Sequence, residues 1–255
     1  MKHPSTTNPS VLIGWDPTDG ATDALDWGVR TAASSGNRLV LFSAFAELRE
    51  SMGPEEYGVA RKAHEMEAST YAGRLRDAGV PCVFETSNDD LRVAMLDAAR
   101  EHDARLIVVG AGSTSAGPGF LHLGSTTEHL AHHTDRPFAV IRSPISIPEQ
   151  LAVAVDGSAH GLAAVRWAAS HARSTDAAVT PVTIERGVRS ANELIAAATD
   201  IDADLIVVGA SPVGDVLKRR VGGVALKVLH DARCSVVLVP ETALDRPDRT
   251  TRRTW

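Results

Sequence analysis

A segment rich in glycine and hydroxyl side chains carries the residue types that bind phosphate. An apolar run ends at Gly110, small residues follow, and a helix is predicted to begin near Gly124 and Ser125. Free backbone N–H groups and the positive end of the helix dipole attract anions at such a helix start. Glycine at 124 lets a phosphate approach the backbone, and the hydroxyls of Ser125, Thr126 and Thr127 can donate to its oxygens. The segment therefore predicts a phosphate site.

The same residues also have a purely structural interpretation. Residues 125–128 have the form of a capping box, with Ser125 as the N-cap and Glu128 as the N3 residue. The P-loop pattern G-x-x-x-x-G-K-[ST] is missing, and Ser115 stands where a dinucleotide fingerprint has its third glycine. A phosphate site and a capped helix are both consistent with this loop.

An aspartate follows the first apolar run of each half of the chain. Asp16 is followed by Thr18, and Asp156 by Ser158. Ligands of parallel sheets bind beyond the carboxyl ends of the strands, where a carboxylate accepts hydrogen bonds from ribose hydroxyls or holds a hydrated metal. The structural alternative is a turn or N-cap residue. Taken singly, each aspartate favours this structural role.

Other candidate sites are weaker. His122, His129, His132 and His133 are close in sequence, and His129 and His133 have the i,i+4 spacing of metal ligands on a helix. No third ligand is evident, so we interpret them as a surface cluster and expect no metal site. No Ser-His-Asp set or carboxylate pair stands at an interpretable spacing, so the pattern does not favour a dedicated hydrolase.

Internal similarity divides the chain into two copies of one unit. Asp16 aligns with Asp156 and Trp27 with Trp167 at a constant offset of 140, which falls to 99 and then 98 in two later matches. Three matches in the same order indicate a duplication, and two copies are too few for a solenoid. The falling offset means that the second copy lacks about 41 residues after its first helix. The matched pairs are 11–33 with 151–172, 104–112 with 203–211, and 136–142 with 234–240.

Each copy alternates short apolar runs with helical patterns, which predicts a parallel sheet covered by helices on both faces. The missing segment corresponds to one helix and one strand, so we expect five strands in the first copy and four in the second. The predicted strands are 11–15, 39–45, 80–86, 106–110, 138–141, 151–155, 178–184, 205–209 and 235–239. The predicted helices are 21–34, 55–78, 89–102, 125–134, 160–173, 190–200 and 223–231.

Composition limits the class of protein. The 255 residues are 44% hydrophobic and 23% charged with a net charge of −6, which fits a globular core and argues against a nucleic-acid-binding surface. No apolar run approaches the roughly 20 residues of a membrane span, and no signal-peptide pattern is visible. Two cysteines make no disulfide framework, so we expect a cytoplasmic protein. Residues 1–9 and 243–255 are polar, and we expect flexible tails there.

The combined pattern resembles the universal stress protein family. The resemblance is carried by the aspartate after the first strand, A-L-x-W in the first helix, V-V-G before the loop and G-S after it. It covers residues 10–142 and 151–240, so the chain looks like two tandem flavodoxin-like (Rossmann-like) open parallel-sheet domains, the second shortened. The resemblance implies strand order 3-2-1-4-5 in the first domain and pairing of the domains through strands 137–142 and 235–240. It also implies a further homodimer.

The resemblance also implies a nucleotide site in the first copy. The family's ATP-binding members hold adenosine against the first two strands and the triphosphate in the loop. The family motif is G-x-x-G, nine residues, then G-S/T. Here Ser113 replaces the second glycine (or Thr114, counting back from Gly124), and the loop is one residue longer. Asp16 corresponds to the ribose contact and Ala44 to the base contact. The implied nucleotide-binding residues are Asp16, Thr18, Ala44, Gly110, Gly112, Ser113, Gly124, Ser125, Thr126 and Thr127.

The second copy departs further from the motif. Gly209 and Gly222 keep the spacing, but Pro212 replaces the second glycine and Gly223 replaces the serine. Proline removes a backbone donor, and a hydroxyl is lost at the helix start. We therefore expect a single nucleotide site, in the first copy. The degenerate second site comprises Asp156, Ser158, Gly209, Pro212, Gly222 and Gly223.

The resemblance implies binding of ATP, with magnesium, or of another adenine nucleotide, in a regulatory stress-response role. No catalytic base is evident, so we expect slow hydrolysis at most. The alternative is a universal stress scaffold that binds no nucleotide and acts through protein–protein contacts or dimerisation. In neither case do we expect a nucleic-acid or membrane partner.

Overall fold

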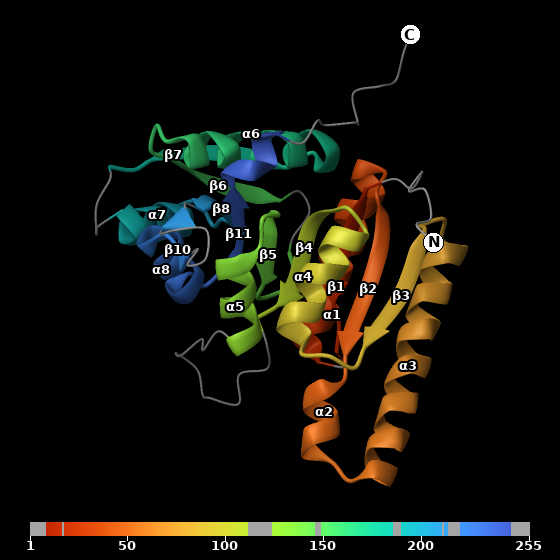
Figure 1. Ribbon diagram of the computed structural model, residues 1–255. Coiled ribbons are helices and arrows are strands. Elements are labelled where there is room, and N and C mark those ends of the chain that lie inside the picture. The colour runs from red at the N-terminus through yellow and green to blue at the C-terminus, as the bar shows by residue number, and fades with distance from the viewer. Residues whose placement is uncertain are drawn as a thin grey trace.

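The described residues form a nine-stranded sheet with helices on both faces (Figure 1). The strand order is β3-β2-β1-β4-β5-β11-β8-β6-β7. We call residues 9–145 the first half and residues 149–245 the second half. The computed structural model describes residues 9–16, 18–111, 124–145, 149–185, 190–210, 212–213 and 220–245.

The first half has the predicted order 3-2-1-4-5, and these strands are all parallel. Its predicted fold class is thereby confirmed. A short helix, α2, was not predicted; it lies between β2 and the long helix α3. The elements are β1 (Ser10–Gly14), α1 (Asp19–Ser35), β2 (Arg38–Ala44), α2 (Ala46–Ser51), α3 (Pro54–Asp77), β3 (Cys82–Ser87), α4 (Leu91–Glu101), β4 (Ala104–Gly110), α5 (Ser125–His133) and β5 (Phe138–Ile141).

The second half contributes β6, β7, β8 and β11 to the sheet, and its described residues include no counterparts of α3 and β3, as the shorter repeat predicted. A two-residue antiparallel pair, β9 with β10, was not predicted. The elements are β6 (Gln150–Val155), α6 (Ala159–Thr175), β7 (Ala178–Thr183), α7 (Ser190–Asp200), β8 (Leu205–Ala210), β9 (Pro212–Val213), β10 (Arg220–Val221), α8 (Gly223–Asp231), β11 (Ser235–Pro240) and the 3-10 helix η1 (Glu241–Asp245).

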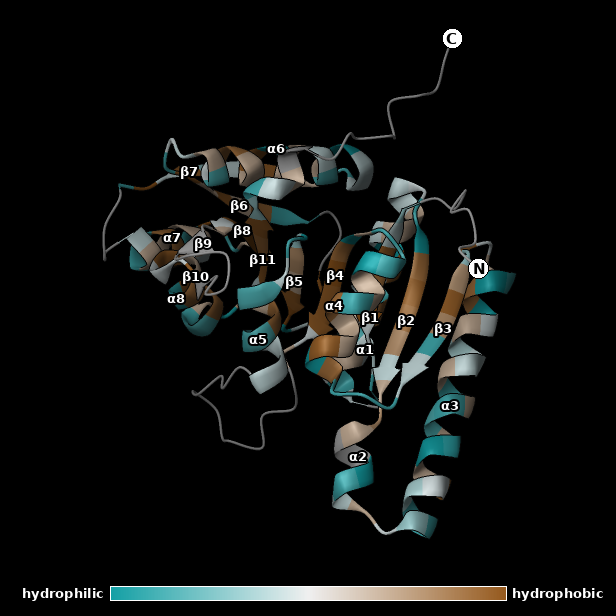
Figure 2. Ribbon diagram, viewed as in Figure 1, coloured by the Kyte–Doolittle hydropathy of each residue, from teal (hydrophilic) through white to brown (hydrophobic). Residues whose placement is uncertain are grey.

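The core lies on both faces of the sheet, because alternate strand residues point to opposite sides. Along β1, Val11 and Ile13 pack on the side of α1, α3 and α6, whereas Leu12 packs on the side of α4, α5, α7 and α8. Figure 2 shows the resulting pattern of apolar central strands and a largely hydrophilic α3. Both hydrophobic clusters contain residues of both halves, so the two halves share their core.

The halves are joined through β5 and β11, which pair antiparallel, with Val140 opposite Val236. These are the strands that the family resemblance implied. Helices α1 and α6 also pack together, and Trp27 of α1 and Trp167 of α6 both contact the ring of His171. The His171 ring stacks on Trp167 at 5.0 Å between centroids and lies 5.6 Å from Trp27. His171 Nε2 lies 2.7 Å from Oε2 of the buried Glu149. This interaction fixes the segment before β6 to the place where α1 and α6 pack together.

Strand β7 lies at one edge of the sheet, because no described residues of the second half form a counterpart of β3 that would cover it. Ala178 and Ile184 donate backbone hydrogen bonds toward β6, so the alternate residues 179, 181 and 183 present their backbone groups outward. Pro181 is the middle one of these and has no N–H. A proline at this position blocks edge-to-edge pairing with another chain.

We expect Pro181→Val to increase self-association. The change restores the central outward donor and adds a β-branched residue to an exposed edge. Sedimentation velocity over a concentration series should show a larger associated fraction than for the wild type. Thr183→Val is the matched control, because it adds the same residue type without restoring a donor. Equal association of Pro181→Val and Thr183→Val would contradict the blocking role of the proline.

Candidate functional site

The two predicted aspartates occupy equivalent turns at the carboxyl edge of the sheet. Asp16 Oδ1 accepts from the N–H of Thr18 at 3.2 Å and from its hydroxyl. Asp156 Oδ1 accepts from the N–H and hydroxyl of Ser158 at 3.0 and 2.6 Å. Thr18 and Ser158 in turn cap the N-termini of α1 and α6. Each aspartate thus holds the turn that starts a helix, which is the structural role recognised in the sequence.

The first glycine of each motif allows a close contact between a strand and a helix. A Cβ on Gly110 would lie 2.4 Å from the carbonyl of Gly20 in α1. A Cβ on Gly209 would lie 2.4 Å from the carbonyl carbon of His160 in α6. No side chain fits at that distance, so β4 and β8 can approach these helices only through glycine. The turn and the loop of each half are thereby held together at the sheet edge.

The later motif glycines begin the helices that follow the loops. Gly124 is the N-cap of α5 and Gly222 the N-cap of α8, and neither helix has a side-chain cap hydrogen bond. The capping-box interpretation is therefore wrong, because Ser125 is already the first helical residue. A Cβ on Gly124 would meet nothing within 4 Å. Space is thus open beside the first turn of α5, where backbone N–H groups lack intrahelical partners.

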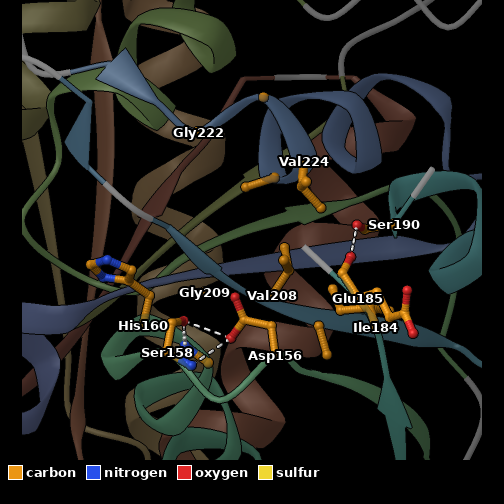
Figure 3. A pocket seen from close by; sticks show the side chains of 14 residues that line it. Asp156, Ser158, His160, Ile184, Glu185, Ser190, Val208, Gly209, Gly222 and Val224 are labelled. Carbon is orange, nitrogen blue, oxygen red and sulfur yellow. Dashed lines mark hydrogen bonds between the residues drawn. The ribbon is translucent and has the colours of Figure 1, made fainter. Parts of the chain in front are cut away.

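A cavity of about 250 Å³ opens at this edge in the second half (Figure 3). Its volume is close to the lower limit, roughly 300 Å³, of small-molecule pockets. Asp156 and Ser158 lie on one side, and Val224 lies opposite, toward the start of α8. The lining residues are Ala154, Asp156, Ser158, His160, Gly161, Ile184, Glu185, Ser190, Val208, Gly209, Gly222, Gly223, Val224 and Ala225.

The cavity combines apolar walls with a few polar groups. His160 Nδ1 lies 3.4 Å from Glu241 Oε2, and the buried Ser190 hydroxyl donates to the carbonyl of Glu185. A Cβ on Gly161 would lie 2.3 Å from Asp156 Oδ1, so this glycine makes room for the carboxylate. The first half has Ala21 at the corresponding position, and there Asp16 is exposed. The described lining residues include no lysine or arginine.

The first half has a different environment on the α3 side of the same edge. The Ser43 hydroxyl donates to the Trp15 carbonyl at 2.7 Å, so it accepts from His64 Nε2 at 2.9 Å. The His64 ring packs edge-on against Trp15 and Phe45, with centroids 4.7 and 5.0 Å apart. Burial lowers the pKa of His64, and the Asp16 carboxylate acts in the opposite direction. These contacts fix α3 to the end of β1 and β2, and no such helix occurs among the residues that the structure describes in the second half.

Most of the site residues predicted from the sequence are described, and they lie at one edge of the sheet. Five of the six positions expected to form a degenerate second site line the cavity: Asp156, Ser158, Gly209, Gly222 and Gly223. Asp16, Thr18, Ala44, Gly110 and 124–127 occupy the equivalent edge of the first half. Gly112 and Ser113 lie outside the described residues, as does the side chain of Pro212.

Sequence reasoning missed several residues of the cavity. Ile184 is the repeat counterpart of Ala44, at the same offset of 140 that relates Asp156 to Asp16. Applying the repeat to Ala44 identifies it directly. Ser190, at the first position of α7, could not be found this way, because the corresponding residue of α4 is Leu91.

The histidine cluster is explained by local contacts. His129 and His133 stack with ring centroids 4.0 Å apart. Within the described part of the chain, no three His, Cys, Asp or Glu side chains are grouped as metal ligands. Among the same residues, no helix combines the length and apolar character needed to cross a membrane.

Solved structures with this arrangement extend over nearly the whole chain. A universal stress protein from Archaeoglobus fulgidus has a TM-score of 0.71 at 15% identity, covering 91% of this chain and 98% of that one. A functionally unknown protein from Pseudomonas aeruginosa has a TM-score of 0.74 at 14% identity, covering 93% and 95%. At these identities the likeness concerns the fold alone. No curated protein matches the chain.

The model of the universal stress protein family matches residues 8–142 and 178–240. Together these segments make up more than half of the chain. This match compares amino-acid sequences, so it is evidence of the relationship that is independent of the likeness in fold.

Proposed function

Because the chain belongs to the universal stress protein family, we propose that it binds an adenine nucleotide at the carboxyl edge of its sheet. The observation that carries this proposal is the convergence of the motif positions on one cavity. Asp156, Gly209 and Gly222 come from β6–α6, β8 and the start of α8, and they line the same space. Ligands of open parallel sheets bind at such an edge, where the strand order reverses.

We place a second site in the first half, where the sequence predicts it. An equivalent aspartate turn and an equivalent close glycine occur there, and space is open at Gly124, the start of α5. Ser125, Thr126 and Thr127 add hydroxyl donors that α8 lacks. The cavity leads us to replace the expectation of one site with a proposal of two sites per chain. Magnesium would accompany the nucleotide phosphates.

The proposed role is regulation rather than rapid turnover. Asp156, His160 and Glu185 are the lining side chains with the chemistry of a general base. Asp156 accepts hydrogen bonds from Ser158, and His160 lies against Glu241. General-base catalysis requires a group positioned on the attacking water. Two of the three candidate bases already have partners within the protein, which favours slow hydrolysis at most.

Calorimetry with ATP and magnesium tests the proposal. We expect saturable binding with two nucleotides per chain, and adenine nucleotide in an acid extract of the purified protein. Binding of one nucleotide per chain would support the one-site prediction. No heat with ATP and no extracted nucleotide would refute nucleotide binding.

A second candidate function is a scaffold that binds no nucleotide. One observation favours it: the motif aspartates and first glycines already have structural roles, in turns and in strand–helix contacts. The calorimetric result with no heat would support this alternative.

A further inference from the structure

Helix α5 leaves the candidate site of the first half and packs against β10 of the second half. Figure 1 shows α5 beside the segment that carries β10 and α8. The contact includes a hydrogen bond between the halves, in which the backbone N–H of Val221 donates to His132 Nδ1 at 3.0 Å. One histidine therefore contacts the backbone of the neighbouring half.

The residue that His132 contacts is next to the cavity. Val221 directly precedes Gly222, which caps α8 and lines the cavity. Val221 is buried, so loss of its acceptor would leave a backbone N–H without compensation from bulk water. His132 thus holds the backbone at the point where the cavity wall begins.

This hydrogen bond requires a neutral imidazole at Nδ1. A protonated ring carries hydrogens on both nitrogens and cannot accept. Protonation of His132 and its bond to Val221 therefore exclude each other. Histidine is the side chain that ordinarily titrates between pH 5 and 8.

The described charged and titratable groups on the elements packed near His132 belong to α5 and α4. On α5 itself, Glu128 Oε1 lies 4.0 Å from Nε2, and the His133 ring centroid lies 6.5 Å away. On α4, which packs against α5, Asp90 and Arg92 pair with each other and act on His129. The side chain of Arg220, on β10, lies outside the described part of the chain.

The duplication repeats the histidine. His132 is the penultimate residue of α5, and His230 is the penultimate residue of α8, at the offset of 98 that relates the last matched segments. The first-half counterpart of Val221 lies outside the described residues, so our inference concerns His132.

We propose that His132 is a positioning residue for the backbone of Val221 and Gly222, which borders the cavity of the second half. When His132 is protonated, it releases this backbone. The ligand part of the inference rests on the proposed function. Nucleotide affinity in the second half then falls as the pH drops from 8 to 6, because the loss of the bond to Val221 loosens the wall at Gly222.

The first experiment needs no ligand. A through-bond ¹⁵N–¹⁵N coupling between the Val221 amide and His132 Nδ1 should be detected by NMR at pH 8 and vanish on acidification. Amide exchange of Val221 should be at least about tenfold faster in His132→Leu than in His133→Leu, the exposed neighbour, at the same pH. Absence of the coupling at pH 8, or equal exchange in the two variants, would overturn the proposal.

The second experiment measures ATP affinity by calorimetry at pH 8 and pH 6. Comparing the two variants at each pH removes the titration of the ATP phosphates. His133→Leu keeps the titrating ring of His132, whereas His132→Leu has lost it. Between pH 8 and pH 6, we therefore expect the ATP affinity of the second-half site to fall at least about fivefold more in His133→Leu than in His132→Leu. An equal fall in both would overturn the regulatory part. If the coupling is detected but ATP binds at neither pH, the positioning role stands and the proposed function fails.

Discussion

Replacing Gly222 by aspartate should remove nucleotide from the second half without destabilising the fold. Gly222 has φ −59° and ψ 150°, an ordinary extended conformation for any residue at an N-cap. Aspartate is among the best N-cap residues, because its carboxylate accepts from the first-turn N–H groups and complements the helix dipole. It thereby takes the donors that a phosphate would use and adds a like charge. We expect an affinity loss of at least about 100-fold, or about 3 kcal/mol, with an unchanged or raised Tm.

Gly124→Asp is the matched variant in the first half. Its backbone angles, φ −60° and ψ 150°, are nearly the same, and a side chain there meets open space. In calorimetry, each variant should retain one of two bound nucleotides. Loss of all binding in Gly124→Asp with full binding in Gly222→Asp would restore the one-site prediction. Full binding in both variants would contradict both proposed sites.

The fold could be predicted because the strands and the repeat leave strong local signals. Runs such as LIVVGA are apolar throughout, as buried parallel strands are, and their order fixes the topology. The difference between the offsets located the missing helix and strand without any structure. Helix α2 was missed because its six residues are too few to show a helical period.

The candidate site was harder to predict because a cavity depends on how elements pack. In the second copy, Gly223 stands where the motif has serine and Pro212 where it has its second glycine. These two replacements suggested a degenerate site. Neither residue reports the space between β6, β8 and α8, which is left open by side chains such as Ala154 and Val224. The sequence also could not distinguish the role of the first motif glycine from that of the last. The spacing of the glycines does not show which atoms a Cβ added at each position would contact.

Gly110→Ala should destabilise the protein, whereas Gly124→Ala should not. The Cβ added at position 110 would lie 2.4 Å from the carbonyl carbon and oxygen of Gly20 and 2.9 Å from the nitrogen of Ala21. These are backbone atoms of α1, so relief requires β4 and α1 to separate. Overpacking of this kind costs about 3 kcal/mol. At Gly124 the new methyl group meets nothing within 4 Å, and the cost stays below about 1 kcal/mol.

Urea denaturation of the two variants measures this difference, and Gly209→Ala extends it to the second half. Its Cβ would lie 2.4 Å from the carbonyl carbon of His160, so it should behave like Gly110→Ala. Equal stability of Gly110→Ala and Gly124→Ala would mean that the first glycine does not serve strand–helix contact. A loss of stability in Gly110→Ala and Gly209→Ala, but not in Gly124→Ala, would instead assign the first glycine of each motif to the packing of the fold. In the first half, Gly124 then remains for the ligand, because a Cβ there would meet nothing within 4 Å.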